Sequence, residues 1–101
     1  MFVLTRLRPP DDEAADFARS GAALLEALSA RPGFLGGELG RAAEEPGLWA
    51  LLTRWDGVGS YRRALSAAPV KIAGAPVWVH AVDEPGVFLD ADDVPLAEAA
   101  R

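Results

Sequence analysis

The residues of this sequence that could do chemistry are mostly aromatic, and they gather around residues 47–61. Trp49 and Trp55 lie six positions apart, so on a β-strand their side chains share one face, and Tyr61 follows in a predicted helix. Together with Trp78, these rings could line an apolar cavity that holds a flat aromatic molecule. The competing interpretation is that the same rings fill a hydrophobic core.

Polar candidates are fewer. His80 is the only histidine, and an imidazole titrates near neutral pH, so His80 is a candidate proton carrier. Arg54 and Arg6 carry guanidinium groups that suit the orientation of an anionic or enolate-like substrate. Ordinary roles stay open for all three: a packed core or interface position for His80, and salt bridges for the arginines.

Several reaction classes are disfavoured by what the sequence lacks. It has no cysteine and a single histidine, so we expect neither a thiol nucleophile nor a metal site. The glycines at 33–37 and 57–59 lack the remaining residues of a phosphate or dinucleotide loop. No serine stands in a nucleophile elbow. The sequence therefore predicts no cofactor, no nucleotide chemistry and no nucleophilic hydrolysis.

Charge and hydropathy limit the partners. The formal net charge of -5 disfavours nucleic acid, because phosphate binding needs a basic surface. No apolar run reaches the length of a membrane span, and the first residues lack the layout of a signal peptide. We therefore expect a cytoplasmic protein that binds no membrane. The abundance of alanine and arginine suggests a bacterial source.

Hydrophobic periodicity and turn residues divide the chain into alternating elements. Apolar residues recur every three or four positions from Ala14 to Leu28 and predict a helix that Arg31–Gly33 ends. Asp56 is the expected cap of a second helix, which ends at Pro69. Residues 70–76 are expected to form a connection or another helical turn. Strands are expected at 2–8, 34–42, 48–55 and 77–82, the last continuing after a bulge at 87–89.

The order of these elements predicts an α+β, ferredoxin-like βαββαβ fold, a four-stranded antiparallel sheet with two helices on one face. We expect one domain at 1–90 and an acidic, alanine-rich tail at 91–101. The strand at 48–55 is apolar on both faces, because Leu48, Ala50 and Leu52 oppose the tryptophans. The face without helices therefore predicts a homodimer whose two sheets pack face to face.

Two segments resemble the antibiotic biosynthesis monooxygenase family, and the likeness extends over roughly residues 2–89. Residues 31–34, Arg-Pro-Gly-Phe, are similar to the family's entry to its second strand. Residues 51–56, Leu-Leu-Thr-Arg-Trp-Asp, resemble its hydrophobic strand ending in Trp and an acid. A helix with an aromatic residue one turn in follows that strand, and this residue is Tyr61 here. The resemblance implies a dimeric α+β barrel.

Members of this family that oxidise aromatic polyketides without metal or flavin hold a pocket between sheet and helices. A strand Trp and a helix Tyr of that pocket correspond here to Trp55 and Tyr61. The accompanying Asn and Arg fall at Leu51 and near Ala75, so half of the polar set is missing. Haem-degrading members use an Asn, a Trp and a His, which this chain does not provide. The corresponding residues are Thr5, Ala64 and Gly74.

Two hypotheses follow. The first is a cofactor-independent monooxygenase that acts on an aromatic quinol or polyketide-like substrate in a pocket between sheet and helices. The second is a non-catalytic small-ligand-binding or accessory barrel of the same fold. For the first, the candidate catalytic residues are Trp55, Tyr61 and His80, and the candidate substrate-binding residues are Trp49, Arg54, Leu51 and Trp78.

Overall fold

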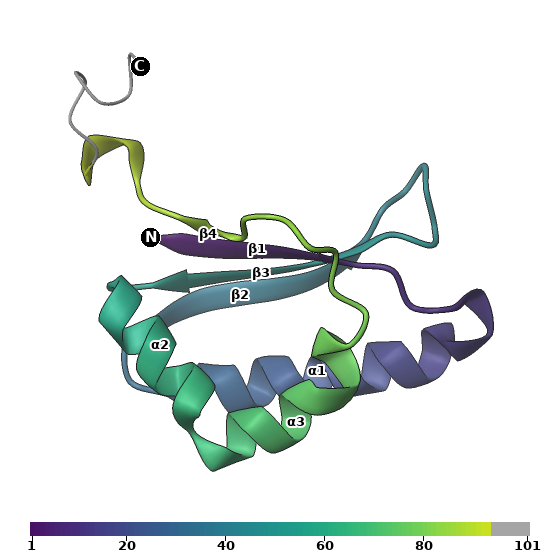
Figure 1. The fold of residues 1–101 in the computed structure, drawn as a ribbon, viewed down its shortest axis with the longest axis horizontal. Coiled ribbons are helices and arrows are strands. Elements are labelled where there is room, and N and C mark those ends of the chain that lie inside the picture. Colours follow the sequence, from purple (N-terminus) through teal and green to yellow (C-terminus); the bar gives the residue numbers. More distant parts are fainter. Residues whose placement is uncertain (94–101) are drawn as a thin grey trace.

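The computed structural model describes residues 1–93 and confirms the ferredoxin-like α+β fold (Figure 1). Of the tail expected at 91–101, only a short 3-10 turn, Ala91–Asp93, falls within the described residues. A similar turn, Asp11–Glu13, precedes the first helix. The main elements are β1 Phe2–Leu7, α1 Ala14–Ser29, β2 Phe34–Arg41, β3 Trp49–Trp55, α2 Val58–Ser66, α3 Ala68–Trp78 and β4 Val87–Phe88.

The sheet has the strand order β2-β3-β1-β4, and every pair is antiparallel. The central strands β1 and β3 pair along their length, from Phe2 opposite Arg54 to Leu7 opposite Trp49. Strands β2 and β3 form the expected hairpin, with a bulge just after Phe34. This sheet is the platform on which the candidate residues of β3 are displayed.

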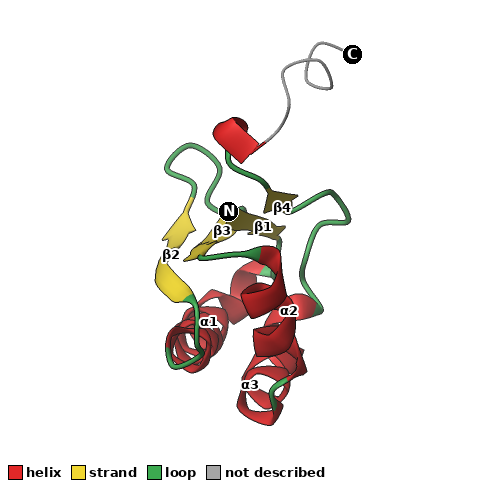
Figure 2. Cartoon of the chain, turned by 90° about the vertical axis from the view of Figure 1, so that its left-hand side faces the viewer, coloured by secondary structure: helices red, strands yellow, loops and turns green. Residues whose placement is uncertain are grey.

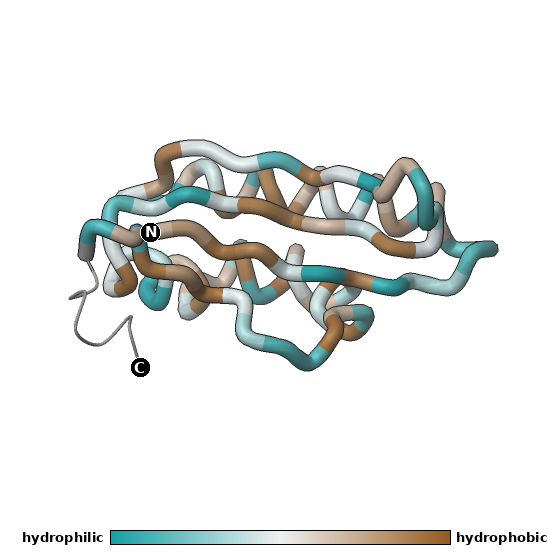
Figure 3. The backbone as a smooth tube through the Cα atoms, turned by 90° about the horizontal axis from the view of Figure 1, so that it is seen from above, coloured by the Kyte–Doolittle hydropathy of each residue, from teal (hydrophilic) through white to brown (hydrophobic). Residues whose placement is uncertain are grey.

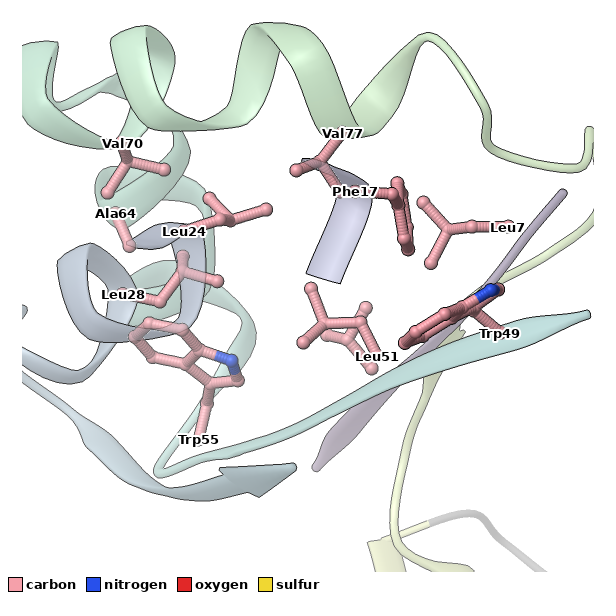
Figure 4. Close-up of a cluster of buried hydrophobic side chains, with 11 residues drawn as sticks. Leu7, Phe17, Leu24, Leu28, Trp49, Leu51, Trp55, Ala64, Val70 and Val77 are labelled. Carbon is pink, nitrogen blue, oxygen red and sulfur yellow. The ribbon is translucent and has the colours of Figure 1, made fainter. Parts of the chain in front are cut away.

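The helices α1, α2 and α3 cover one face of the sheet, and none of the α-helices in residues 1–93 lies on the other face (Figures 1 and 2). Side chains alternate along the strands accordingly, so that Trp49, Leu51 and Trp55 are buried toward the helices while Arg54 is exposed. The shared face predicted for the two tryptophans is therefore confirmed. The buried core comprises Val3, Leu7, Phe17, Leu24, Leu28, Trp49, Leu51, Trp55, Ala64, Val70 and Val77 (Figure 4).

The strand expected at 77–82 is wrong, as is the expectation of two helices. Residues 68–78 form a third helix, α3. This helix is apolar on nearly every side, so its hydrophobic residues do not recur with the helical period. A buried strand would give the same continuous apolar pattern, so the sequence alone does not distinguish the two structures. Inside α3, Trp78 folds back one turn over Gly74, where an added Cβ would lie 2.4 Å from the indole nitrogen. The fourth strand is β4, within the expected continuation at 87–89.

After α3 the chain does return to β1, but only through isolated contacts. Arg8 N–H donates to the carbonyl of His80 (2.9 Å), and Val82 N–H donates to the carbonyl of Arg6 (2.8 Å). A single bridge joins Leu7 and Ala81. The segment after α3 therefore contacts β1, while the strand expected at 77–82 does not form.

The boundary between the second and third helices also differs from expectation. α2 ends at Ser66 because Ala67 is extended, with φ -72° and ψ 135°. Pro69 falls in the first turn of α3, where its missing N–H costs nothing. Asp56 makes no capping hydrogen bond from its side chain, and Gly57 holds the cap position. Within residues 1–93, no helix has both the length and the apolarity to cross a membrane.

Candidate functional site

Trp55 ends β3 with a fully buried side chain that points toward the helices (Figure 4). The edge of the Phe34 ring meets it at a centroid distance of 5.3 Å, and the Tyr61 ring lies tilted against it at 5.7 Å. Its indole N–H donates to Thr53 Oγ1 at 2.9 Å, inside the protein. Three elements, β2, β3 and α2, therefore fix the position of this ring.

Tyr61 reaches Trp55 because the turn between β3 and α2 is anchored to the loop before β2. Asp56 N–H donates to the carbonyl of Gly33 at 2.9 Å, and Gly33 adopts the left-handed φ of +90° that this approach requires. Burial raises the pKa of Tyr61 above its ordinary value of 10.0. The phenol is therefore protonated at neutral pH and can donate a hydrogen bond, while the raised pKa makes it a weaker acid than a free tyrosine.

A second aromatic cluster lies at the other end of β3. Phe17 of α1 packs its ring edge-on against Trp49 at 5.2 Å and against His80 at 5.8 Å. The guanidinium of Arg41 lies 5.1 Å from the Trp49 ring centroid. Six residues of extended strand, roughly 20 Å, separate this cluster from Trp55. His80 and Tyr61 therefore do not converge on the same small substrate.

The remaining candidates are dispersed. Leu51 is buried on β3 between the two tryptophans. Arg54 and Arg6 point to the face without helices, where the Arg54 guanidinium lies 6.0 Å from the Phe2 ring centroid. Trp78 is the last residue of α3 and does not belong to the sheet. Of the residues that the sequence singled out, the structure brings Trp55 and Tyr61 into contact and leaves both arginines on the opposite side.

Thr53 is the site residue that the sequence analysis missed. It is one of two polar residues among the buried set, with 3% of its surface exposed, and it is the hydrogen-bond partner of Trp55. The signal was present in the sequence, because residues two apart on a strand share a face. Thr53 is the next residue after Leu51 whose side chain faces the helices. Leu51 corresponds to the position at which the enzymes that this sequence resembles have an Asn.

The polar groups at this end suit proton donation and the orientation of a ring rather than metal binding. Among residues 1–93, no three His, Asp or Glu side chains lie close enough together to hold a metal ion. Three surface hollows of about 340, 340 and 310 Å³ open on the described part of the chain. Trp49 lines the first together with residues of the helix-free face, and both Arg54 and Trp55 line the third. The space between β3 and the helices is instead occupied by buried side chains (Figure 4).

Comparisons with known proteins agree with this architecture. The family model described as antibiotic biosynthesis monooxygenase matches residues 1–73. No curated protein matches the sequence. Among solved structures, the chain is similar to a protein from Caulobacter crescentus named for the same family, with 24% identity, coverage of 89% of this chain and 87% of that chain, and a TM-score of 0.75.

A second solved structure is SnoaB from Streptomyces nogalater, described as a cofactor-independent oxygenase. It shares 20% identity over 89% of this chain and 90% of its own, with a TM-score of 0.75. A third, named antibiotic biosynthesis monooxygenase, shares 16% identity over 93% of this chain and 98% of its own, with a TM-score of 0.76. At these identities the likeness shows a common fold.

Proposed function

Because the chain belongs to the antibiotic biosynthesis monooxygenase family, we propose that it oxidises an aromatic quinol or polyketide-like substrate without metal or flavin. The observation that carries this proposal is the contact between the fully buried Trp55 and the partly buried Tyr61, the two residues that correspond by sequence resemblance to the family's strand Trp and helix Tyr. The substrate would bind between β3 and α2, beside this pair. Binding there requires side chains that now fill the space to move.

Cofactor-free oxygenation needs a substrate that becomes electron-rich. Loss of a proton to bulk water as the substrate enters gives a phenolate or carbanion, which passes one electron to O₂, and the resulting radical pair combines to form a carbon–oxygen bond. The peroxide then loses water and leaves a carbonyl. In this scheme Trp55 orients the flat ring system, Tyr61 donates a proton to the departing oxygen, and the apolar walls exclude water.

Oxygen uptake with anthrone-like and hydroquinone substrates, in metal-free and flavin-free buffer, tests this function. We expect uptake by the wild-type protein and a loss of roughly 10²-fold or more in rate in Tyr61→Phe, the range for removal of a general acid. Arg19→Gln is the control, because Arg19 is an exposed residue of α1 that belongs to neither aromatic cluster. Uptake that Tyr61→Phe and Trp55→Phe leave intact would place the site elsewhere.

One observation favours a second candidate, a ligand-binding or accessory barrel without chemistry. Leu51 stands where the polyketide-oxidising members hold an amide, and Leu51 and Trp55 are both buried by their neighbours. Absence of oxygen uptake, together with stoichiometric binding of an apolar dye, would support this alternative.

For either function we propose a homodimer in which two helix-free sheet faces pack together. Half-buried and exposed apolar residues on that side, among them Leu4, Leu52 and Phe88, support this arrangement. The cytoplasmic location and bacterial source expected from the sequence stay predictions.

A further inference from the structure

Two aromatic rings lie between Trp55 and solvent. The Trp55 side chain has no exposed surface, and the rings of Phe34 and Tyr61 contact it at centroid distances of 5.3 and 5.7 Å. Phe34 and Tyr61 are only partly buried, so each reaches from Trp55 to the surface. A flat molecule that enters from solvent and lies against Trp55 therefore displaces one of these two rings.

Phe34 is the first residue of β2, at the edge of the sheet. Strand β2 forms the outer border of the sheet on the side away from β4, so it has a neighbouring strand on one side only (Figure 3). Phe34 is paired directly with Trp55, and both side chains face the helices. The dimer proposed above covers the opposite face of the sheet, so a second copy leaves Phe34 accessible.

The tip of the Phe34 ring lies above a glycine. A Cβ added at Gly37 would lie 3.2 Å from Phe34 Cζ and 2.9 Å from a Leu25 methyl carbon. The Phe34 ring therefore extends from Trp55 to Gly37, where β2 has no side chain. Removal of the ring would leave an apolar cavity beside these residues, and an apolar cavity of about 150 Å³ binds a benzene-sized ring.

Of the two rings that cover Trp55, the Phe34 ring is the one that a substrate ring can replace. Tyr61 carries the hydroxyl that the proposed reaction uses, and a 2.9 Å hydrogen bond from Asp56 N–H to the Gly33 carbonyl anchors the start of its helix. The Phe34 side chain contributes only apolar and aromatic contacts. A substrate ring in its place would restore the contacts with Trp55.

We propose that Phe34 determines how many fused rings a substrate can have, because its side chain fills the place that the outermost ring of a larger substrate would take beside Trp55. This inference rests on the proposed function, since it concerns the same Trp55–Tyr61 site. The wild-type protein then selects the narrower members of the quinol and polyketide-like class. A smaller residue at position 34 admits a substrate that is one ring wider.

Two unreactive fluorescent probes that differ by one fused ring test this proposal on the full chain. Naphthalene-2-sulfonate has two rings and anthracene-2-sulfonate has three, and both carry the same anion. The ratio of their dissociation constants therefore reports on the number of rings. We expect the wild type to bind the two-ring probe more tightly. In Phe34→Ala the ratio should shift by roughly tenfold or more toward the three-ring probe, because the pocket gains matching apolar space.

Two further variants complete the series. Phe34→Leu keeps more of the apolar volume and should shift the ratio in the same direction by a smaller factor. Leu35→Ala is the matched control, because it truncates the adjacent residue of β2, whose side chain is 68% exposed. Leu35→Ala should leave the ratio at the wild-type value.

Thermal unfolding gives a second measurement, because truncation of Phe34 also lowers stability. The three-ring probe should raise the melting temperature of Phe34→Ala more than that of the wild type, since a ligand that fills the cavity stabilises the folded state. Where Phe34→Ala does not fold, the ratio in Phe34→Leu decides the question.

An unchanged ratio in the Phe34 variants would overturn the proposal. A shift in Leu35→Ala instead would also overturn it and would place the probes in the hollow that Leu35 and Arg54 line. None of these measurements uses oxygen. A shifted ratio without oxygen uptake contradicts the oxygenase and supports the role of Phe34 in binding, whereas oxygen uptake with an unchanged ratio contradicts only the role of Phe34.

Discussion

The indole N–H of Trp55 donates a 2.9 Å hydrogen bond to Thr53 Oγ1, and both side chains are buried. The two residues lie two apart on β3, so strand alternation directs both toward the helices. An unpartnered N–H in an apolar interior is costly. Thr53 therefore helps to fix the direction in which the Trp55 ring meets Tyr61.

Replacement of Thr53 by valine keeps the shape and removes the acceptor. We expect Thr53→Val to lower the free energy of unfolding by about 1–3 kcal/mol, the cost of an orphaned buried donor. In a Trp55→Phe background there is no N–H to orphan, so the same change should be close to neutral. Denaturant unfolding of the four proteins measures the difference. Equal effects of Thr53→Val in both backgrounds would contradict a role for this hydrogen bond.

Two glycines of the β2 region should respond oppositely to alanine. At Gly33, φ is +90° and an added Cβ would lie 2.4 Å from Ser60 Oγ, so Gly33→Ala should cost about 1–3 kcal/mol of stability. At Gly40 the space is open, so Gly40→Ala should be neutral or stabilise by about 0.5–1 kcal/mol. Thermal unfolding checks both. Similar losses at the two positions would refute the distinction.

The parts of the fold that could be predicted are the helices and strands in which only one face is hydrophobic. The buried residues of α1, Phe17, Leu24 and Leu28, recur at helical spacing, and those of β3 alternate. Each pattern arises from one element facing one core, so it can be read from local sequence. The same alternation could also have separated Arg54 from Trp55, since adjacent strand residues point to opposite faces.

The third helix and the position of His80 could not be predicted in this way. α3 is apolar around nearly its whole circumference, so neither period identifies it. Its helical state depends on packing beside α1, where Val77 is buried in the shared core. Because of that contact between distant segments, Trp78 lies in a helix instead of a strand, and His80 packs against Phe17. The sequence of residues 77–82 alone does not predict this packing against α1.

Tyr61 should make stability depend on alkaline pH. Burial raises its pKa in the folded protein above the ordinary value of 10.0, so the fold favours the protonated phenol. This stabilisation is complete below pH 10 and is lost as pH rises through the folded-state pKa. The free energy of unfolding should therefore fall more steeply above pH 10 in the wild type than in Tyr61→Phe.

An absorbance titration tests the same group directly. Tyr61 is the only tyrosine, so the tyrosinate band reports on it alone. We expect a midpoint above pH 10 in the folded protein and near pH 10 in denaturant. A midpoint at or below pH 10 in the folded state would contradict the buried position of the phenol.

The proposed dimer predicts different effects of one charge on two faces. Leu52 is half-buried at the centre of the helix-free face, and Ile72 is a 77% exposed residue of α3. An unpaired carboxylate buried between two sheets costs several kcal/mol, so Leu52→Glu should weaken dimerisation by about 10³-fold. Ile72→Glu should leave the dimer intact, because α3 lies on the other side. Sedimentation at micromolar concentration measures both. A monomeric wild type would contradict the face-to-face arrangement. So would a dimer that dissociates in Ile72→Glu but not in Leu52→Glu.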